Sequence, residues 1–237
     1  MPLPKIDQPL FELTIPSTGK KAKYRPFTVK EEKILLIAQE SKDMDQVILA
    51  IKQIITNCLP KVDPDSLAIF DLEYIMLQLR AKAVNNMIEF KINDPETEEE
   101  IDVQMDINEI DITRDPNHKD IVNVTDDIVL KLKYPTIDYI KELQTDQEAD
   151  EAKESELLFN LMRNCIESVV QGETVYKLSD FTDKEVEDFI DGLGSNVITA
   201  VKDFFDTVPQ MRFEYKYVNK NGTEQTFVAK GTETFFI

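Results

Sequence analysis

A chain of 237 residues is long enough for one large domain or two small ones, and it can bury about 70% of the surface that its unfolded form exposes. Its formal net charge of −19 disfavours binding to nucleic acid or to anionic membranes, because both are themselves negatively charged. The sequence has no apolar run long enough to span a bilayer and no apolar segment of a secretory signal near its start. These features predict a globular cytoplasmic protein.

The first segment, residues 1–86, is predicted to form a hairpin followed by three helices. Apolar and polar residues alternate around a Pro-Ser-Thr-Gly turn within residues 10–27, as in two paired strands. Thr28 and Glu31 then fit a capping box, in which each side chain accepts a hydrogen bond from a backbone N–H, so we expect a helix to about Ser41. Its expected apolar face contains Ile34, Leu35, Ile37 and Ala38. Apolar residues at helical spacing predict two more helices, over residues 43–58 and 70–84.

The central segment, residues 87–143, alternates apolar and polar residues as half-buried strands do. The predicted strands cover residues 87–92, 101–105, 107–112 and 128–134. The acidic run NDPETEEE between the first two suits a hairpin tip, and a short helix is expected over residues 136–143. The carboxylates of IDVQMDINEIDI fit the solvent side of a strand, because the glycine-containing turn of a calcium loop is missing there.

The third segment, residues 144–237, returns to helices and closes with a hairpin. A charged stretch leads into a helix predicted over residues 157–170, and Thr182 with Glu185 fits a second capping box. The elements predicted after it are helices over residues 186–193 and from 195 to about 206, and a hairpin over residues 211–236. Together the segments predict an α+β fold, with helical segments flanked by N- and C-terminal β-hairpins and a central antiparallel β region. The three segments are expected to be domains or parts of one compact unit.

Residues suited to catalysis or cofactor binding are scarce. Six glycines form neither a GxGxxG loop nor a Walker motif, and one histidine, His118 in the polar loop TRDPNHKD, cannot by itself supply a catalytic triad. Cys58 and Cys165 lie beside apolar residues of predicted helices, which favours two buried thiols over a disulfide or a zinc site. We therefore predict no enzyme, no cofactor, no metal and no small-molecule substrate. A hydrolase that uses surface carboxylates is the alternative from another class.

Five motifs, spread in order over most of the chain, resemble one protein family. They are YRPFTVKEEKILLIA (24–38), LKLKYPTIDYIKE (130–142), SDFTDKEVEDFIDGL (179–193), FFDTVPQM (204–211) and KGTETFF (230–236). This family is the baseplate hub assembly family of T-even-type contractile-tailed bacteriophages. The resemblance implies a non-catalytic role in forming the hub, either as an assembly chaperone or as a structural subunit retained in the virion. It also implies hub or tail proteins as partners, and the host cytoplasm as the location during assembly.

The first two motifs both place a strand, a Tyr, a Pro and a Thr before a helix. A duplicated unit and convergent use of good helix caps both explain this pattern.

The turn of the last hairpin departs from the pattern of the family. Members often carry a Cys-x-x-Cys turn in the last hairpin, whereas this chain has VNKNGTEQ (218–225), so we expect Asn221 and Gly222 to form the turn without a metal.

Exposed residues of the two terminal hairpins are the predicted contacts with a partner protein. They are Phe11, Tyr24, Arg25, Phe27, Tyr215, Tyr217, Phe235 and Phe236. Aromatic and arginine side chains often carry much of the binding energy at protein interfaces. The alternative is that the rings fill the core.

Overall fold

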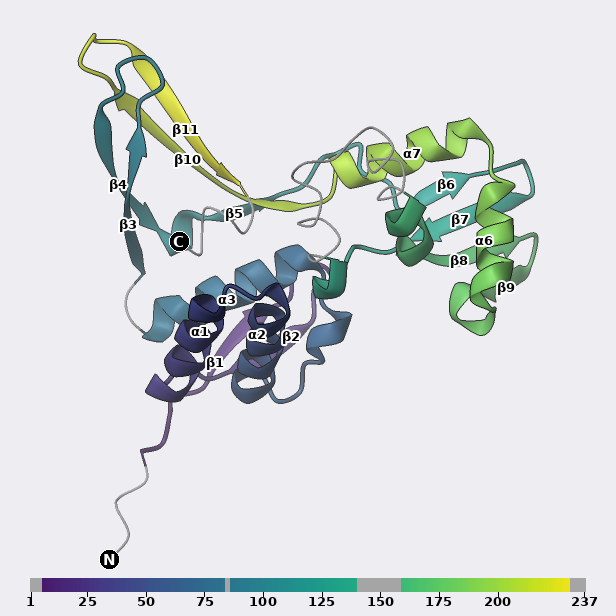
Figure 1. The fold of residues 1–237 in the computed structure, drawn as a ribbon, viewed down its shortest axis with the longest axis horizontal. Helices are drawn as coiled ribbons and strands as arrows, with labels where there is room; N and C mark the ends of the chain where they lie inside the picture. The colour runs from purple at the N-terminus through teal and green to yellow at the C-terminus, as the bar shows by residue number, and fades with distance from the viewer. Residues whose placement is uncertain (1–5, 84–85, 140–158, 231–237) are drawn as a thin grey trace, which may run out of the picture. The chain divides into compact units, whose positions relative to one another are not determined.

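The computed structural model describes residues 6–83, 86–139 and 159–230, which fold as an α+β protein with two compact units (Figure 1). Unit 1 comprises Met1–Thr113 and Gln210–Ile237, and unit 2 comprises Arg114–Pro209. The C-terminal hairpin belongs to unit 1 because its first strand pairs with residues 111–113. The predicted α+β class is confirmed. The three sequence segments do not coincide with the two units, and their independent folding stays a prediction.

The N-terminal half of unit 1 packs three helices with a two-stranded hairpin. Its elements are β1 (Phe11–Thr14), β2 (Lys21–Tyr24), α1 (Val29–Ser41), α2 (Met44–Cys58), the 3-10 turn η1 (Pro64–Ser66) and α3 (Ile69–Ala83). Leu13 and Ala22 pair across the antiparallel hairpin and are both buried, while their neighbours on β1 and β2 alternate with them in exposure. The predicted hairpin and the three predicted helices are confirmed.

Helix α3 is buried on most of its surface, including the acidic side chain of Asp71 near its start. This carboxylate accepts hydrogen bonds from the backbone N–H of Ser17 at 2.8 Å and of Ala68 at 3.2 Å. Because a buried charge needs such partners, Asp71 fixes the β1–β2 turn against the first turn of α3.

The second half of unit 1 consists of strands that are distant in the sequence. They are β3 (Met87–Asn93), β4 (Glu100–Asp106), β5 (Asp111–Thr113), β10 (Gln210–Val218) and β11 (Glu224–Lys230). β3 and β4 form one hairpin, and β11, β10 and β5 form an antiparallel sheet in that order. Leu77 of α3 shares a core with Met105 of β4 and Met211 of β10, so the helix and both groups of strands pack together.

One predicted strand, over residues 107–112, is wrong in its first half. Ile107–Glu109 instead form the 3-10 turn η2, and only the last residues belong to β5. The cause is local, because the side chain of Asp106 accepts a hydrogen bond from the backbone N–H of Asn108 and caps the turn. Ile107 is buried in this turn, so its apolar character does not distinguish a turn from a strand.

In unit 2, helices α6 and α7 pack against a four-stranded antiparallel sheet (Figure 1). The elements of unit 2 are β6 (Ile121–Asn123), β7 (Ile128–Leu132), the 3-10 turn η3 (Ile137–Tyr139), β8 (Ile166–Gln171), β9 (Thr174–Lys177), the 3-10 turn η4 (Leu178–Asp180), α6 (Asp183–Asp191) and α7 (Ser195–Asp206). The strand order is β6-β7-β8-β9. Leu130 of β7 packs with Val186 of α6 and Val201 of α7 in a common core. The capping box of Thr182 and Glu185 is confirmed, as are both helices.

The helix predicted over residues 157–170 is wrong from residue 166 onward. Residues 159–165 are helical, but Ile166–Gln171 form β8, which pairs with β7 and with the unpredicted strand β9. This IESVVQ segment is rich in β-branched residues, and short apolar spacing does not separate a helix from a buried strand. Gly172, with a φ of 57°, allows the tight turn that follows. The short helix predicted after the second Tyr-Pro step begins as η3, and its remainder lies outside the described residues.

Candidate functional site

The junction between β2 and α1 is built around one buried carboxylate. Glu31, in the first turn of α1, is 0% exposed. Its two oxygens accept hydrogen bonds from both terminal nitrogens of the Arg25 guanidinium, at 2.9 and 3.1 Å. They also accept the backbone N–H of Thr28 at 3.1 Å and the side-chain amide of Asn57, on α2, at 3.3 Å. The predicted capping box is confirmed, and Arg25 and Asn57 extend it into a network that fixes α1 to α2.

This network sets the protonation of its members. Burial acts to raise the pKa of Glu31, but hydrogen bonds from Arg25 and Thr28 outweigh burial and lower that pKa to about 2. Burial raises the pKa of the Cys58 thiol, at the end of α2, to about 11. Glu31 is therefore a structural anion at neutral pH, and Cys58 is an unreactive thiol.

Helix α1 carries large apolar side chains on its solvent side. Val29, Leu36 and Ile37 are 79, 58 and 57% exposed, whereas Ala38 is buried. Positions i, i+7 and i+8 lie on the same side of a helix, so these three exposed side chains form one surface, which we call the α1 face. The exposure of Ile37 corrects the predicted apolar face, which placed this residue toward the core. Clustered exposed apolar residues are typical of contact surfaces, whereas single ones are ordinary.

The tips of two hairpins in unit 1 lie side by side (Figure 1), and a second buried carboxylate joins them. Asp94, just after β3, accepts hydrogen bonds from the Tyr217 hydroxyl at 2.8 Å and from the backbone N–H of Thr97 at 2.7 Å. Glu96 accepts one from the side-chain amide of Asn219 at 2.8 Å. Burial acts to raise the pKa of Asp94, but its hydrogen bonds lower it to about 2. Together, the hydrogen bonds of Asp94 and Glu96 hold the β3–β4 tip against the β10–β11 tip.

The turn of the last hairpin is stabilised by its own polar groups. The side-chain oxygen of Asn219 accepts hydrogen bonds from the backbone N–H groups of Asn221 and Thr223, each at 3.0 Å. Gly222 has a φ of 80°, a conformation that glycine adopts without strain. The predicted turn at Asn221 and Gly222 is confirmed.

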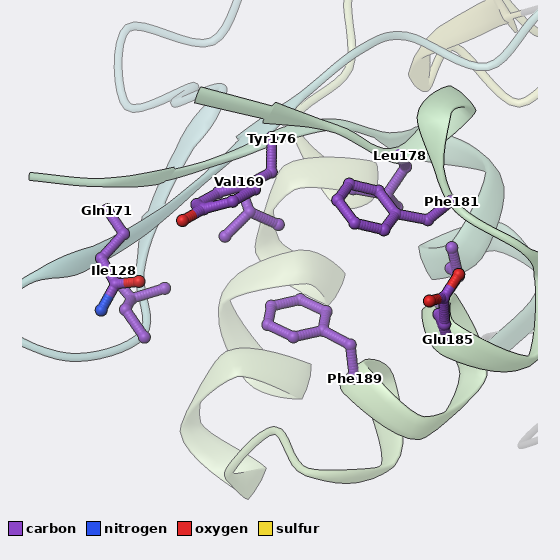
Figure 2. Close-up of a pocket in the computed structure, with 9 residues that line it drawn as sticks. Ile128, Val169, Gln171, Tyr176, Leu178, Phe181, Glu185 and Phe189 are labelled. Carbon is purple, nitrogen blue, oxygen red and sulfur yellow. The ribbon is translucent and has the colours of Figure 1, made fainter. Parts of the chain in front are cut away.

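A cavity of about 320 Å³ lies between the sheet and α6 in unit 2 (Figure 2). Its apolar walls include Val169, Tyr176, Leu178, Phe181 and Phe189. In Figure 2, Phe189 extends from α6 beneath the rings of Tyr176 and Phe181. The carboxylate of Glu185 also lines the cavity, but it accepts the backbone N–H of Thr182 at 2.9 Å as part of the capping box. The cavity is therefore suited to an apolar group, at the small end of the range for ligand pockets.

His118 is packed among aromatic rings, although its sequence neighbours are polar. Its ring stacks on Tyr134, with centroids 5.5 Å apart, and lies 5.0 Å from the ring of Phe204. Nδ1 lies 2.9 Å from the hydroxyl oxygen of Thr207, and Nε2 is buried without a hydrogen-bond partner among the described residues. Burial lowers the pKa of the imidazole, so the neutral ring is favoured. His118 is therefore part of the packing of unit 2.

The described residues contain no cluster suited to a metal centre: no group of three or more His, Cys, Asp or Glu side chains is placed there to hold a metal ion. No helix there has both the length and the apolar character needed to cross a membrane.

Comparison with known proteins gives the family of the chain. Residues 8–237 match the family model described as T4 bacteriophage base plate protein. The chain belongs to this family. A search of curated proteins gives no match, and a search of solved structures gives none either. The predicted resemblance to a baseplate family is therefore confirmed over nearly the whole chain, and it indicates other tail or baseplate proteins as partners.

The contact residues predicted for this baseplate protein lie in different environments. Tyr24 is 2% exposed and belongs to the core. The half-buried residues are Phe11, Arg25, Phe27, Tyr215 and Tyr217. Arg25 and Tyr217 donate hydrogen bonds to buried carboxylates, and Phe235 and Phe236 lie outside the described residues. The terminal hairpins stay a predicted contact region. The α1 face and the unit 2 cavity were not predicted, because exposure depends on packing that one sequence does not show.

Proposed function

We propose that this baseplate protein is a non-enzymatic factor that binds other proteins while the hub of the baseplate assembles. The observation that supports it most directly is the α1 face, an exposed apolar surface on a helix. Residues 29–38 of that helix, which include the whole α1 face, belong to YRPFTVKEEKILLIA, the motif that most resembles the hub assembly family. The family match supports the setting, and the α1 face supports the mode of action.

The α1 face has the properties of a surface that is buried in a complex. Burying one Val, Leu or Ile side chain contributes about 1.5–3 kcal/mol, so three of them can form the centre of an interface. The hydrogen bonds between Arg25 and Glu31 fix the start of α1 before a partner arrives. A surface that is already ordered loses less conformational entropy on binding.

Two alternative functions predict different observations. A structural hub subunit would remain in the finished particle, so mass spectrometry of purified virions would find it, whereas an assembly factor that leaves would be absent. A carboxylate-based hydrolase needs a general acid that is protonated near neutral pH. The buried carboxylates Glu31 and Asp94 have pKa values of about 2, so both are ionised at neutral pH and neither suits the role of a general acid.

The experiment is to introduce Leu36→Glu with Ile37→Glu into the phage gene and to examine infected cells. We expect the folded variant to accumulate while complete baseplates, counted by electron microscopy, become rare. The matched control is Leu49→Glu, which adds a charge at an exposed apolar residue of α2 in the same unit. Normal numbers of baseplates with a folded Leu36→Glu, Ile37→Glu variant would refute the role of the α1 face.

A further inference from the structure

Strand β9 forms a free edge of the unit 2 sheet. The sheet order is β6-β7-β8-β9, and within the described residues no strand pairs with the outer side of β9. A two-residue turn joins β8 to β9, so Gln171 and Thr174 form its closing hydrogen-bonded pair. Hydrogen-bonded and non-hydrogen-bonded pairs alternate along such a hairpin. Val175 and Lys177 therefore direct their backbone N–H and C=O groups away from β8, to the side on which no described strand lies.

The apolar cavity adjoins this edge. Tyr176, between the two outward-facing residues of β9, forms one wall, and Phe181 follows in the chain after η4 (Figure 2). Tyr176 and Phe181 are 39 and 43% exposed, so they mark the side on which the cavity meets solvent. Alternate side chains of a strand placed beside β9 would lie on the same face of the sheet as Tyr176. One large apolar side chain of such a strand could therefore enter the cavity toward Phe189.

Charge determines which kind of strand fits this edge. Unit 2 contains 22 acidic and 10 basic residues, a net charge of −12. Helix α6 alone has five acidic residues and one basic residue, and its Glu185 lines the cavity. A second copy of the chain would bring the same negative charge against this surface, which is unfavourable, whereas lysine and arginine side chains would be attracted.

We propose that the β9 edge and the adjoining cavity bind an extended basic segment of another protein, which adds to the sheet as a fifth strand and inserts one apolar side chain beside Phe189. Backbone hydrogen bonds at Val175 and Lys177 would hold the segment, and the cavity would select its anchor residue. This inference rests on the proposed function, because it assigns a partner chemistry to a protein-binding factor. It concerns a surface separate from the α1 face.

The test uses the full chain, labelled with ¹⁵N, and the synthetic peptide acetyl-Lys-Val-Lys-Phe-Lys-Val-Lys-amide as the probe. We expect the peptide to slow amide hydrogen exchange of Val175 and Lys177 about tenfold or more and to shift the ring signals of Tyr176 and Phe189. The same peptide with Glu in place of Lys, and one with N-methyl groups along one edge, should bind about tenfold more weakly or not at all.

Two variants locate the binding. Val175→Pro removes an outward-facing N–H while leaving the bonds to β8, and should weaken peptide binding about tenfold. Its matched control is Ile121→Pro on the opposite edge strand β6. On that edge the backbone N–H of Leu132 donates a hydrogen bond to the carbonyl of Asp120. Because hydrogen-bonded and non-hydrogen-bonded pairs alternate, the N–H of the next residue, Ile121, faces away from β7. Since proline can prevent folding, Glu173→Lys with Asp188→Lys provides a second variant, which should weaken binding with the fold intact.

The outcomes separate this inference from the proposed function. Peptide signals confined to another surface, equal binding of the acidic peptide, or a dimer through β9 in sedimentation experiments would each overturn the inference. If no peptide binds while Leu36→Glu with Ile37→Glu still blocks baseplate formation, the inference fails and the proposed function stands. If β9 binds the basic peptide but the α1 variant assembles normally, the role of the α1 face fails instead.

Discussion

Replacing Glu31 with Gln measures how much the buried ion pair contributes to the stability of unit 1. The pKa of Glu31 is about 2 in the folded protein, compared with its ordinary value of 4.5. Because the folded pKa is the lower one, the ion pair stabilises the fold fully above pH 4.5, and this contribution is lost as the pH falls toward 2. The difference between the two pKa values corresponds to about 3 kcal/mol at pH 7 and to about 1 kcal/mol at pH 3.

The assay is urea unfolding followed by far-ultraviolet circular dichroism at both pH values. Gln resembles the protonated carboxyl group in shape, so Glu31→Gln should lower the free energy of unfolding by about 3 kcal/mol at pH 7 and by about 1 kcal/mol at pH 3. Glu32→Gln is the matched control, because Glu32 lies in the same turn but is exposed, and it should change stability by less than about 0.5 kcal/mol. Equal losses at the two pH values would show that packing, rather than charge, accounts for the effect.

Three further predictions concern other buried groups. Tyr217→Phe removes a hydrogen bond to Asp94, so the pKa of Asp94 should rise toward its ordinary value in an NMR titration. The midpoint temperature of unfolding should also fall. An unchanged pKa of Asp94 would contradict this prediction. Unit 2 should lose stability in urea unfolding as the pH falls below about 6.5, because His118 takes up a proton more readily in the unfolded chain than in the folded one. His118→Phe should make the stability of unit 2 depend less on pH in this range. A variant whose stability falls as steeply as that of the original protein would contradict this prediction. Iodoacetamide at about pH 8 should label Cys58 and Cys165 only after unfolding, because both are buried, and rapid labelling of the folded protein would contradict this.

Elements whose signals are local could be predicted from the sequence. Thr28 with Glu31, and Thr182 with Glu185, each identify a helix start, because the capping partners lie three residues apart and need no distant contact. The last hairpin was predictable for the same reason, since Gly222 supplies the turn conformation by itself.

Features that depend on distant partners were missed. The segment IESVVQ satisfies helical spacing, but it becomes β8 because β7 and β9 supply hydrogen-bond partners on both of its edges. Ile37 fits an apolar helix face, yet only the packing of α1 decides which of its sides is covered. Tyr217 and Asp94 are 123 residues apart, so no local pattern could reveal that they are bonded. The α1 face and the unit 2 cavity were missed for the same reason, because exposure is a property of the folded chain.

Salt separates the two proposed surfaces by their physics. Binding at the α1 face buries apolar side chains, so its association rate should change little between about 50 and 500 mM NaCl. Binding of a basic segment at β9 relies on the net charge of −12 on unit 2, and its association rate should fall by about tenfold or more over the same range. Stopped-flow measurements with a purified partner protein test this, using Leu36→Glu with Ile37→Glu and Glu173→Lys with Asp188→Lys to remove each surface in turn. If the Glu173→Lys, Asp188→Lys variant keeps the full salt dependence, the charge that attracts the partner is not supplied by these two carboxylates.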